Sequence, residues 1–357
     1  MATNGDLWDA AAFRNDVERA VLGFVDQRSA WLADLGNDAV RLIASARESV
    51  IGGKRLRAAF CWWGHLAIAP PSDEAALLRA CGSLELLHAS ALVHDDFMDG
   101  SDVRRGRPST HRDYEALHSK LKWTGSSRQY GAAAAVLLGD LLLAWSDEML
   151  RTCGLPSERV NSALGYFDLT RSEVITGQFL DVSAQARGTS DVDVAMKVLR
   201  YKSAKYSIER PIHIGAALAG ADADTVGALS RFGLPLGEAF QLRDDLLGVF
   251  GDPDVTGKPA GDDLVEGKRT VLVALALDAL SPDDARHLDA SLGTNLSPDE
   301  VAVLCDLIDR SGAHAQVEEA IQALTQRALT ALDEARIDAQ ARAVLQELAD
   351  AATQRVV

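Results

Sequence analysis

The chain has 357 residues, of which 47% are hydrophobic and 25% are charged, so its composition is that of a folded globular protein rather than a disordered or fibrous one. Its 36 lysines and arginines against 52 aspartates and glutamates give a formal charge of −16, which disfavours nucleic acid as a partner. The four cysteines form no CxxC pair, so we expect neither a zinc site nor a disulfide framework, and a cytoplasmic location. Without an export signal or an apolar run of roughly 20 residues, we also expect no membrane span.

Apolar residues recur at helical spacing in most long segments, whereas alternating strand-like runs are nearly absent. This pattern predicts an all-α fold, a helical bundle around a central cavity, in one domain over residues 1–357. The expected helices cover 8–34, 36–48, 53–68, 73–99, 110–120, 129–152, 157–181, 191–219, 222–250, 268–280, 297–310 and 313–354. Segments rich in Gly, Pro, Ser and Asp, such as 100–109, 251–267 and 281–298, are expected to be loops.

The segment ELLHASALVHDDFMDGSDVRRGRPS contains the first residues that predict chemistry. On a helix Asp95 and Asp99 share a face, with Asp96 turned about 100° away, so two carboxylates project together from the last turn before Gly100. Two such carboxylates repel each other, and their position at a helix C-terminus opposes the helix dipole. A divalent cation relieves both effects, and Mg²⁺ commonly combines one or two carboxylates with phosphate oxygens of a substrate.

A second acidic pair, Asp244 and Asp245, lies in AFQLRDDLLGVFGDP. The surrounding pattern is helical and apolar, and an uncompensated carboxylate is costly there. Gln241 lies one turn earlier on the same side. Because helical bundles build their sites from inward-facing side chains, acidic pairs on two separate helices predict metal ions in the cavity of the bundle.

Cationic side chains lie beside both acidic motifs. In GGKRLR, Lys54 and Arg57 are expected at the start of a helix, after glycines that let the backbone approach a ligand closely. Arg104 and Arg105 follow the first acidic motif in a loop bounded by glycine, and arginine forks suit phosphate oxygens. In a chain this acidic, such a gathering predicts the binding of diphosphate. The lysines beside the later motifs are Lys202, Lys258 and Lys268.

Five segments resemble, in order and spacing, the successive motifs of the trans-isoprenyl diphosphate synthases, the polyprenyl synthetase family: GGKRLR, DDFMDGSDVRRGRPS, GQFLD, YKSAKYS and QLRDDLLGVFGDPDVTGKPAGDDLVEGKRT. The match spans residues 50–270, and bacterial short-chain farnesyl and geranylgeranyl diphosphate synthases look nearest. The resemblance implies an isoprenoid-synthase-type bundle, a homodimer, and the condensation of isopentenyl diphosphate with an allylic diphosphate: dimethylallyl, geranyl or farnesyl diphosphate.

The resemblance also implies a role for each matched residue. Asp95 and Asp99 would hold two Mg²⁺ ions and Asp244 a third, with Mn²⁺ as an alternative ion. The supporting carboxylates would be Asp96, Asp245 and Asp262. The allylic diphosphate would be clamped by Arg104, Lys202 and Lys258, and isopentenyl diphosphate would be bound by Lys54, Arg57, His88 and Arg105. Gln241 would lie near the reacting carbons, Ser203 stands where Thr is more usual, and Gln178 and Asp181 form the GQxxD element.

Two features bear on metal affinity and product length. Gly248 gives DDLLG where many relatives carry a third aspartate, so we expect activity with weaker metal binding. In the family an aromatic residue four or five positions before the first aspartate commonly stops growth at C15. Here those positions are Ala91 and Ser90, with Leu87 one turn further back, which favours a C20 product, geranylgeranyl diphosphate; C15 and C25 are the alternatives.

Three other functions fit parts of the pattern. A terpene cyclase would share the cavity and the metals but would not need the isopentenyl diphosphate residues. A di-iron bundle protein would use ExxH pairs, and Glu85/His88 and Glu115/His118 have that spacing. A non-catalytic subunit of a heteromeric synthase would usually have lost one acidic motif, whereas both are present here.

Overall fold

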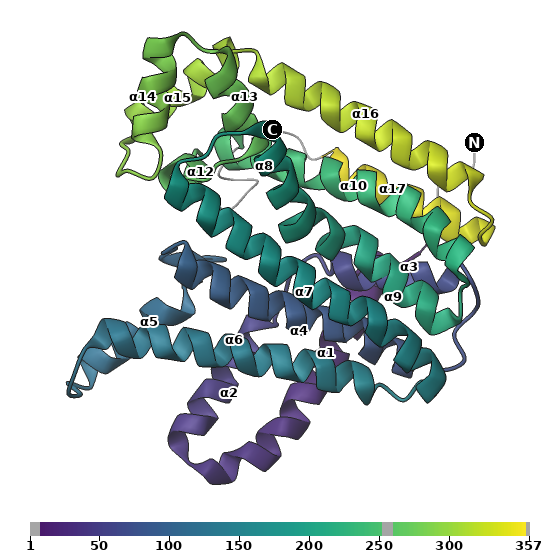
Figure 1. Ribbon diagram of the computed structural model, residues 1–357. Helices are drawn as coiled ribbons and strands as arrows, with labels where there is room; N and C mark the ends of the chain where they lie inside the picture. Colours follow the sequence, from purple (N-terminus) through teal and green to yellow (C-terminus); the bar gives the residue numbers. More distant parts are fainter. Residues whose placement is uncertain (1–7, 252–259, 355–357) are drawn as a thin grey trace. The chain divides into compact units, whose positions relative to one another are not determined.

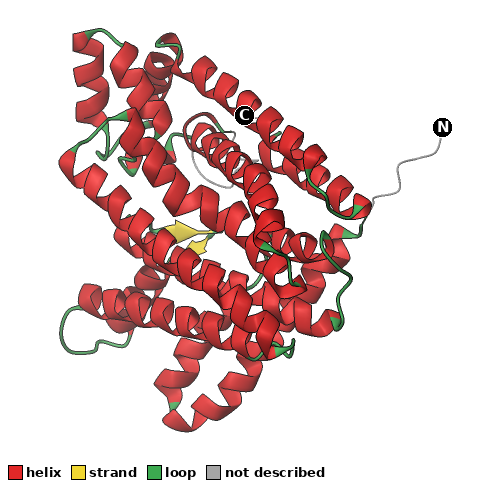
Figure 2. Cartoon of the chain, turned by 45° about the vertical axis from the view of Figure 1, so that its right-hand side comes forward, coloured by secondary structure: helices red, strands yellow, loops and turns green. Residues whose placement is uncertain are grey.

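A computed structural model describes residues 8–251 and 260–354, and helices make up nearly all of their regular structure (Figures 1 and 2). The all-α prediction is therefore confirmed. The chain divides into two compact units, residues 1–164 with 214–221 and residues 165–213 with 222–357. We call these the first and the second unit and describe each by itself; a single domain over the whole chain stays a prediction.

The first unit is built from helices and one short hairpin. Its elements are α1 (Ala10–Leu32), the 3₁₀ turn η1 (Ala33–Leu35), α2 (Asn37–Ser49), α3 (Leu56–Leu66), α4 (Glu74–Met98), β1 (Val103–Arg104), β2 (Arg107–Pro108), α5 (Thr110–Lys120), α6 (Ser127–Arg151), the start of α7 (Ser157–Arg187) and the end of α9 (Arg210–Ala219). Figure 2 shows β1 and β2 as the short arrows.

The central helix of the first unit is α4, which packs against α1, α3 and α6. Asp73 caps its start by accepting a hydrogen bond from the Ala76 amide, and most of its side chains are buried. Among the described residues it is the one helix with the length and hydropathy of a membrane span, but 72% of its apolar window is buried inside the protein. That degree of burial is typical of a core helix.

Helices α4 and α6 approach each other closely at Gly139. A Cβ atom there would lie 2.1 Å from Nε2 of His94, so a larger residue at this position would require the His94 ring to move. One turn back on α4, Ser90 Oγ donates a 2.7 Å hydrogen bond to the Gly139 carbonyl. This contact fixes the register of the helix that carries the first acidic motif.

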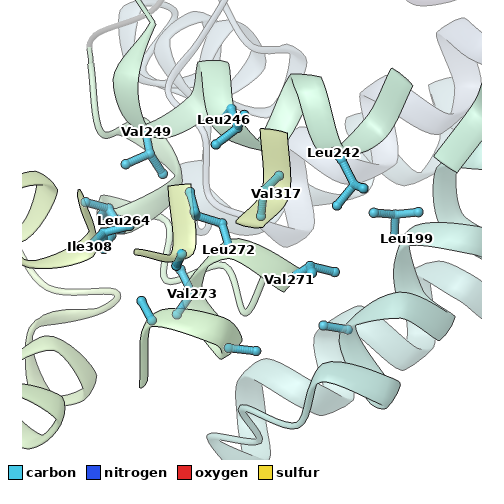
Figure 3. Packing of buried hydrophobic residues seen from close by; sticks show 14 of the residues in the cluster. Leu199, Leu242, Leu246, Val249, Leu264, Val271, Leu272, Val273, Ile308 and Val317 are labelled. Atoms are coloured by element: carbon cyan, nitrogen blue, oxygen red, sulfur yellow. The ribbon is translucent and has the colours of Figure 1, made fainter. Parts of the chain in front are cut away.

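The second unit contains the remaining elements. They are the rest of α7, α8 (Val192–Val198), the π-helix η2 (Leu199–Glu209), the start of α9, α10 (Ala223–Phe250), α12 (Asp262–Val265), α13 (Val271–Ala279), α14 (Pro282–Ser291), α15 (Pro298–Arg310), α16 (Ala313–Glu334) and α17 (Ala339–Thr353). Its core joins α10 to α12, α13, α15 and α16 through buried aliphatic side chains, among them Leu246, Val249, Leu264, Leu272 and Val317 (Figure 3).

Several helix predictions need correction. The expected loop over 281–298 contains α14, which begins with Ser281 as its cap and Pro282 in its first turn. The expected helix over 313–354 is interrupted at residues 335–338, where Asp338 caps α17 by accepting from two backbone amides. Residues 199–209 of the expected helix over 191–219 wind as a π-helix. The hairpin and the single turn α12 lie in segments expected to be loops.

Two buried histidines make a prediction about acid stability. Burial lowers the pKa of His65 in α3 and of His213 in α9 to about 4. Arg210 Nη1 lies 3.1 Å from Nδ1 of His213, an arrangement in which the neutral ring accepts the hydrogen bond. Because the folded protein binds these protons less readily than the unfolded chain, the free energy of unfolding should be fully retained above pH 6.5 and should fall as the pH drops towards 4, by about 3 kcal/mol at most for each histidine.

Urea unfolding at pH 7 and at pH 4.5 measures this loss. His213→Gln should lose less stability between the two pH values than the wild type, whereas the same change at the exposed His287 should leave the loss unaltered. An equal loss in all three proteins would show that the buried rings do not control acid stability.

Candidate active site

The first acidic motif lies at the end of α4. Asp99 caps the helix with φ −80° and ψ −10°, and its amide donates to the Asp95 carbonyl at 2.8 Å, so Asp95 and Asp99 share a helix face as the spacing predicts. Both side chains are partly exposed. Asp96 is buried and accepts a 2.8 Å hydrogen bond from Nε of Arg104. The motif therefore presents two carboxylates outward and anchors the third with an arginine.

The hairpin after α4 sends two adjacent arginines in different directions. Strands β1 and β2 are antiparallel, and Arg105 and Gly106 form the turn with φ of 52° and 73°, the left-handed geometry of a two-residue hairpin. Arg104 reaches back to Asp96, whereas Arg105 Nη1 donates to the Ile51 carbonyl at 2.9 Å. The hairpin thereby joins the first acidic motif to the GGKRLR segment.

The GGKRLR segment differs from its prediction at one point. Helix α3 begins at Leu56, so Lys54 precedes the helix and does not form an i,i+3 pair with Arg57 on it. The residue between them, Arg55, has left-handed geometry with φ 53° and is buried. Its guanidinium binds Glu85 at 3.2 Å and Glu18 at 3.0 Å, which holds the turn in place. Sequence reasoning missed this role because a buried ion pair between distant residues has no linear motif.

Several arginines lie close to His88, which is about two helical turns before Asp95 of the first acidic motif. Burial lowers the pKa of His88 well below its usual value, and the nearby charges of Arg57 and Arg105, then of Arg104 and Arg55, lower it further. The imidazole is therefore neutral at pH 7. The structure thus gathers Arg57, His88 and Arg105, which the sequence assigns to one diphosphate, around a surface that favours an anion.

The ExxH pairs are engaged in contacts that do not suit a di-iron site. Glu85 binds Arg55, Glu115 accepts from Arg112 Nη1 at 2.9 Å, and His118 Nε2 lies 3.1 Å from the Thr124 carbonyl. Within the part of the chain that the structure describes, no three His, Cys, Asp or Glu side chains are gathered as the ligands of one metal ion. A metal ion bound by one or two of the described carboxylates would need further ligands, such as phosphate oxygens or water.

The second acidic motif lies on α10 in the second unit. Asp245 is buried and accepts a 2.8 Å hydrogen bond from Gln241 Nε2, which confirms that these two side chains share a side of the helix. Burial raises the pKa of Asp245 well above its usual value, and the negative charges of Asp263 and Asp244 raise it further. Hard oxygen donors with an excess of negative charge fit a divalent cation. Asp263 is a member of this group that sequence reasoning did not assign.

The YKSAKYS segment forms most of the π-helix η2, a geometry that frequently marks functional sites. Lys202 Nζ donates to Asp181 Oδ2 at 2.6 Å, so the structure joins two residues that the sequence assigned separately. A Cβ atom at Gly177 of α7 would lie 2.3 Å from the Lys202 nitrogen, and one at Gly237 of α10 would lie 2.4 Å from the Ala204 carbonyl oxygen. These two glycines let neighbouring helices touch the backbone of η2, and they position Lys202.

A partly buried ion network that the sequence did not predict fixes the end of η2. Glu173 of α7 accepts from Nε and Nη2 of Arg210 at 2.7 and 2.8 Å and from Lys205 Nζ at 3.1 Å. These contacts keep the pKa of Glu173 below its usual value against the opposing effect of burial. The second lysine of YKSAKYS is the one sequence signal that could have indicated this network.

The remaining predicted residues are placed as follows. Lys258 lies outside the described residues, Asp262 begins α12, and Ser203 and Gln178 are partly exposed in η2 and α7. Of the predicted product-length residues, Leu87 and Ser90 are buried in the first unit, whereas Ala91 is partly exposed. The position of Ala91 therefore has more room for a larger side chain than the positions of Leu87 and Ser90.

Comparison with known proteins agrees with these features. The polyprenyl synthetase family model matches residues 40–308. A crystal structure of geranylgeranyl pyrophosphate synthase from Corynebacterium glutamicum, complexed with isoprenyl diphosphate and magnesium, has a TM-score of 0.95 and 40% identity, and covers 98% of this chain and 100% of that one. Geranylfarnesyl diphosphate synthase of Aeropyrum pernix is 33% identical over 85% of this chain and 91% of its own. A farnesyl diphosphate synthase of Mycobacterium tuberculosis is 34% identical over 73% and 68%, respectively.

The chain belongs to the polyprenyl synthetase family, as its motifs predict. It is a prenyltransferase enzyme of isoprenoid biosynthesis, and isoprenyl diphosphates are its substrate class. The relatives make products of different length, C15, C20 and C25, and so do not by themselves decide the product of this chain.

Proposed function

We propose that the enzyme is Mg²⁺-dependent and condenses isopentenyl diphosphate with dimethylallyl, geranyl or farnesyl diphosphate to give mainly geranylgeranyl diphosphate. The observation that carries this proposal is the gathering of Arg57, Arg104 and Arg105 around a neutral His88 in the first unit, in a chain whose sequence also has two acidic motifs. The Corynebacterium relative, which is complexed with isoprenyl diphosphate and magnesium, supports it. A product assay with radiolabelled isopentenyl diphosphate tests it: elongation should require Mg²⁺ or Mn²⁺ and stop at C20, and full activity in excess EDTA would contradict it.

The residues would divide between metal and substrate. Asp95, Asp99 and Asp244 would hold three Mg²⁺ ions, which when bound supply positive charge to a departing diphosphate. The supporting carboxylates would be Asp96, Asp245 and Asp262. Arg104, Lys202 and Lys258 would bind the allylic diphosphate, and Lys54, Arg57, His88 and Arg105 would bind isopentenyl diphosphate. Gln241 would lie near the reacting carbons and Ser203 would bind substrate. Of the GQxxD element formed by Gln178 and Asp181, Asp181 would support Lys202.

The chain's own cations would prepare the leaving group. Arg104 and Lys202 are held by Asp96 and Asp181, so each long side chain is already ordered before substrate binds. Fixed positive groups stabilise charge that develops on the diphosphate as the allylic bond breaks. The released diphosphate would then accept the proton that is lost after isopentenyl addition.

A terpene cyclase and a non-catalytic subunit are weaker proposals. A cyclase has no need of the second anion site that the arginines around His88 provide. A subunit without activity would not need both acidic motifs, and this chain retains both. Activity of the purified chain alone, with elongated linear products, would separate prenyl transfer from both alternatives.

The assignment of two diphosphate sites predicts a selective kinetic effect. Lys54→Ala and Arg57→Ala should each raise KM for isopentenyl diphosphate about tenfold or more, with a smaller effect on the KM of the allylic substrate, because each removes a cation from one site. Arg47→Ala, which removes a partly exposed arginine paired with Asp26, is the control. Equal changes for both substrates would show that the two sites are wrongly divided.

We further propose that the enzyme is a cytoplasmic homodimer. In the second unit, α7 exposes Leu169, Ile175 and Phe179 to 48%, 57% and 70%. In the first unit, α6 exposes Leu137 to 59%. Apolar side chains exposed in this way along a helix are typical of surfaces covered by a partner, and a second copy of the chain is the partner that the family resemblance implies.

Light scattering coupled to gel filtration tests the dimer. The wild type should have twice the mass of the chain at micromolar concentration, and Phe179→Asp should shift it towards the monomer because a buried charge in an apolar interface is costly. Val303→Asp, on an exposed position of α15, should have no effect. A monomeric wild type would refute the proposal.

A further inference from the structure

The loop that joins α5 to α6 in the first unit exposes apolar side chains. It covers residues 121–126 and lies at the tip of this helix pair (Figures 1 and 2). Leu121 is 46% exposed and Trp123 is 39% exposed. Neither side chain belongs to the proposed metal or diphosphate sites. Exposed apolar side chains that lie next to one another often mark a contact surface.

The same segment is basic in an otherwise acidic chain. Residues 116–139 contain no aspartate or glutamate, although the chain has 52 of them among its 357 residues. Lys120, Lys122 and Arg128 lie in this stretch, and all three side chains are exposed. The tip therefore presents positive charges beside Leu121 and Trp123, a combination that is complementary to a negatively charged surface with an apolar layer beneath it.

The backbone of the loop is fixed, so these side chains are presented from a defined framework. The Trp123 amide donates to the His118 carbonyl at 3.2 Å, and His118 Nε2 lies 3.1 Å from the Thr124 carbonyl oxygen. The rings of His118, Trp123 and Tyr130 pack against one another with centroids 5.2 to 6.0 Å apart. These rings also line a cavity of about 430 Å³, which gives the tip a recess beside its cations.

A second apolar tip in the first unit differs from this one in its charge. Trp31 and Leu35, at the turn between α1 and α2, are 75% and 74% exposed. The carboxylates of Asp34 and Asp38 are exposed beside them, and they would be repelled by an anionic surface. This tip therefore serves as a control that has the apolar exposure without the acid-free basic stretch.

We propose that the α5–α6 loop docks the enzyme onto a membrane surface that contains anionic phospholipid. Each lysine or arginine near such a surface strengthens binding roughly fivefold, and tryptophan is favoured at the level of the headgroups. Isoprenyl diphosphates, the substrate class of this enzyme, join an apolar chain to a charged group, so longer ones partition into bilayers. A docked enzyme releases its product beside the bilayer that takes it up. This docking goes beyond the proposed function and uses none of the residues assigned to metal or diphosphate.

Sedimentation of the full chain with vesicles tests the cations. The wild type should bind vesicles of phosphatidylcholine mixed with phosphatidylglycerol, should bind vesicles of phosphatidylcholine alone much more weakly, and should be released by salt. The double variant Lys120→Gln with Lys122→Gln should weaken binding to the anionic vesicles roughly twentyfold, because it removes two positive charges. Lys197→Gln, on an exposed position of α8, is the matched control and should bind as the wild type does.

The apolar side chains are tested in the same assay. Trp123→Ser should weaken binding roughly tenfold, because it removes the side chain that enters the headgroup layer. Leu121→Ser should act similarly, and it leaves the ring packing of His118 and Tyr130 in place. Trp31→Ser should have no effect. All of these variants should keep wild-type elongation activity in solution.

Each outcome decides for or against docking. A wild type that does not sediment with the anionic vesicles, or lysine variants that bind as tightly as the wild type, would overturn the proposal. So would Leu121→Ser and Trp123→Ser variants that retain full binding, because the attraction would then be a general one to anions. If light scattering showed that Leu121→Ser converts a dimer into a monomer, the tip would be a contact with a second copy and not a membrane surface. Prenyl transfer itself is tested separately by the product assay.

Discussion

Asp244→Ala is expected to lower turnover by about a thousandfold or more while leaving the helical circular dichroism spectrum unchanged. A bound divalent cation typically contributes several kcal/mol of charge stabilisation when a diphosphate departs, and about 4 kcal/mol corresponds to a thousandfold in rate. Asp95→Ala should have a similar effect. Neither side chain lies in the hydrophobic core, so the fold should survive.

Steady-state turnover at saturating substrate and Mg²⁺ measures this effect, and the control is Asp278→Ala on an exposed position of α13. The control should retain wild-type turnover. Asp96→Ala is a useful contrast, because it also removes the partner of Arg104 and should therefore lower thermal stability as well as activity. If Asp244→Ala and Asp95→Ala retained wild-type turnover, the metal assignment would be wrong.

The helices were predictable because apolar periodicity and capping residues act locally. Asp73, Ser126 and Asp222 each accept a backbone hydrogen bond at the start of a helix. The spacing of apolar residues then indicates which face of each helix is buried. The π-helix η2 was not predictable in this way. Its apolar pattern resembles that of an α-helix, and its register depends on the close approach of Gly177 and Gly237 from two other helices.

The sequence identified most residues of the candidate site, but it did not predict which of those residues contact one another. Linear motifs identified Lys202 and Asp181, and their ion pair follows from the packing of α7 against η2. Arg55 and its partners Glu85 and Glu18 come from three separate segments, so no spacing rule could join them. The position of Asp263 beside Gly248 is a further case, because a missing side chain in one helix is meaningful only when its neighbour is known.

We propose that product length is determined by the side chains of α4 in the two turns before Asp95, namely Leu87, Ser90 and Ala91. Leu87 is buried, and Ser90 is tied to the Gly139 carbonyl, so neither can easily move to stop a growing chain. Ala91, partly exposed one turn before Asp95, leaves space where a large residue would close it. An enzyme with this arrangement should extend farnesyl diphosphate by one further five-carbon unit.

Ala91→Phe is therefore expected to shorten the main product from C20 to C15. The aromatic ring would fill the space beside the growing prenyl chain, and the loss of one isoprene unit should appear in chromatography of the dephosphorylated products from radiolabelled isopentenyl diphosphate. Leu92→Phe is the matched control, because the neighbouring residue is turned about 100° around the helix and should leave the product at C20. A wild type that stops at C15, or an Ala91→Phe variant that still makes C20, would place the limit on chain growth on another helix.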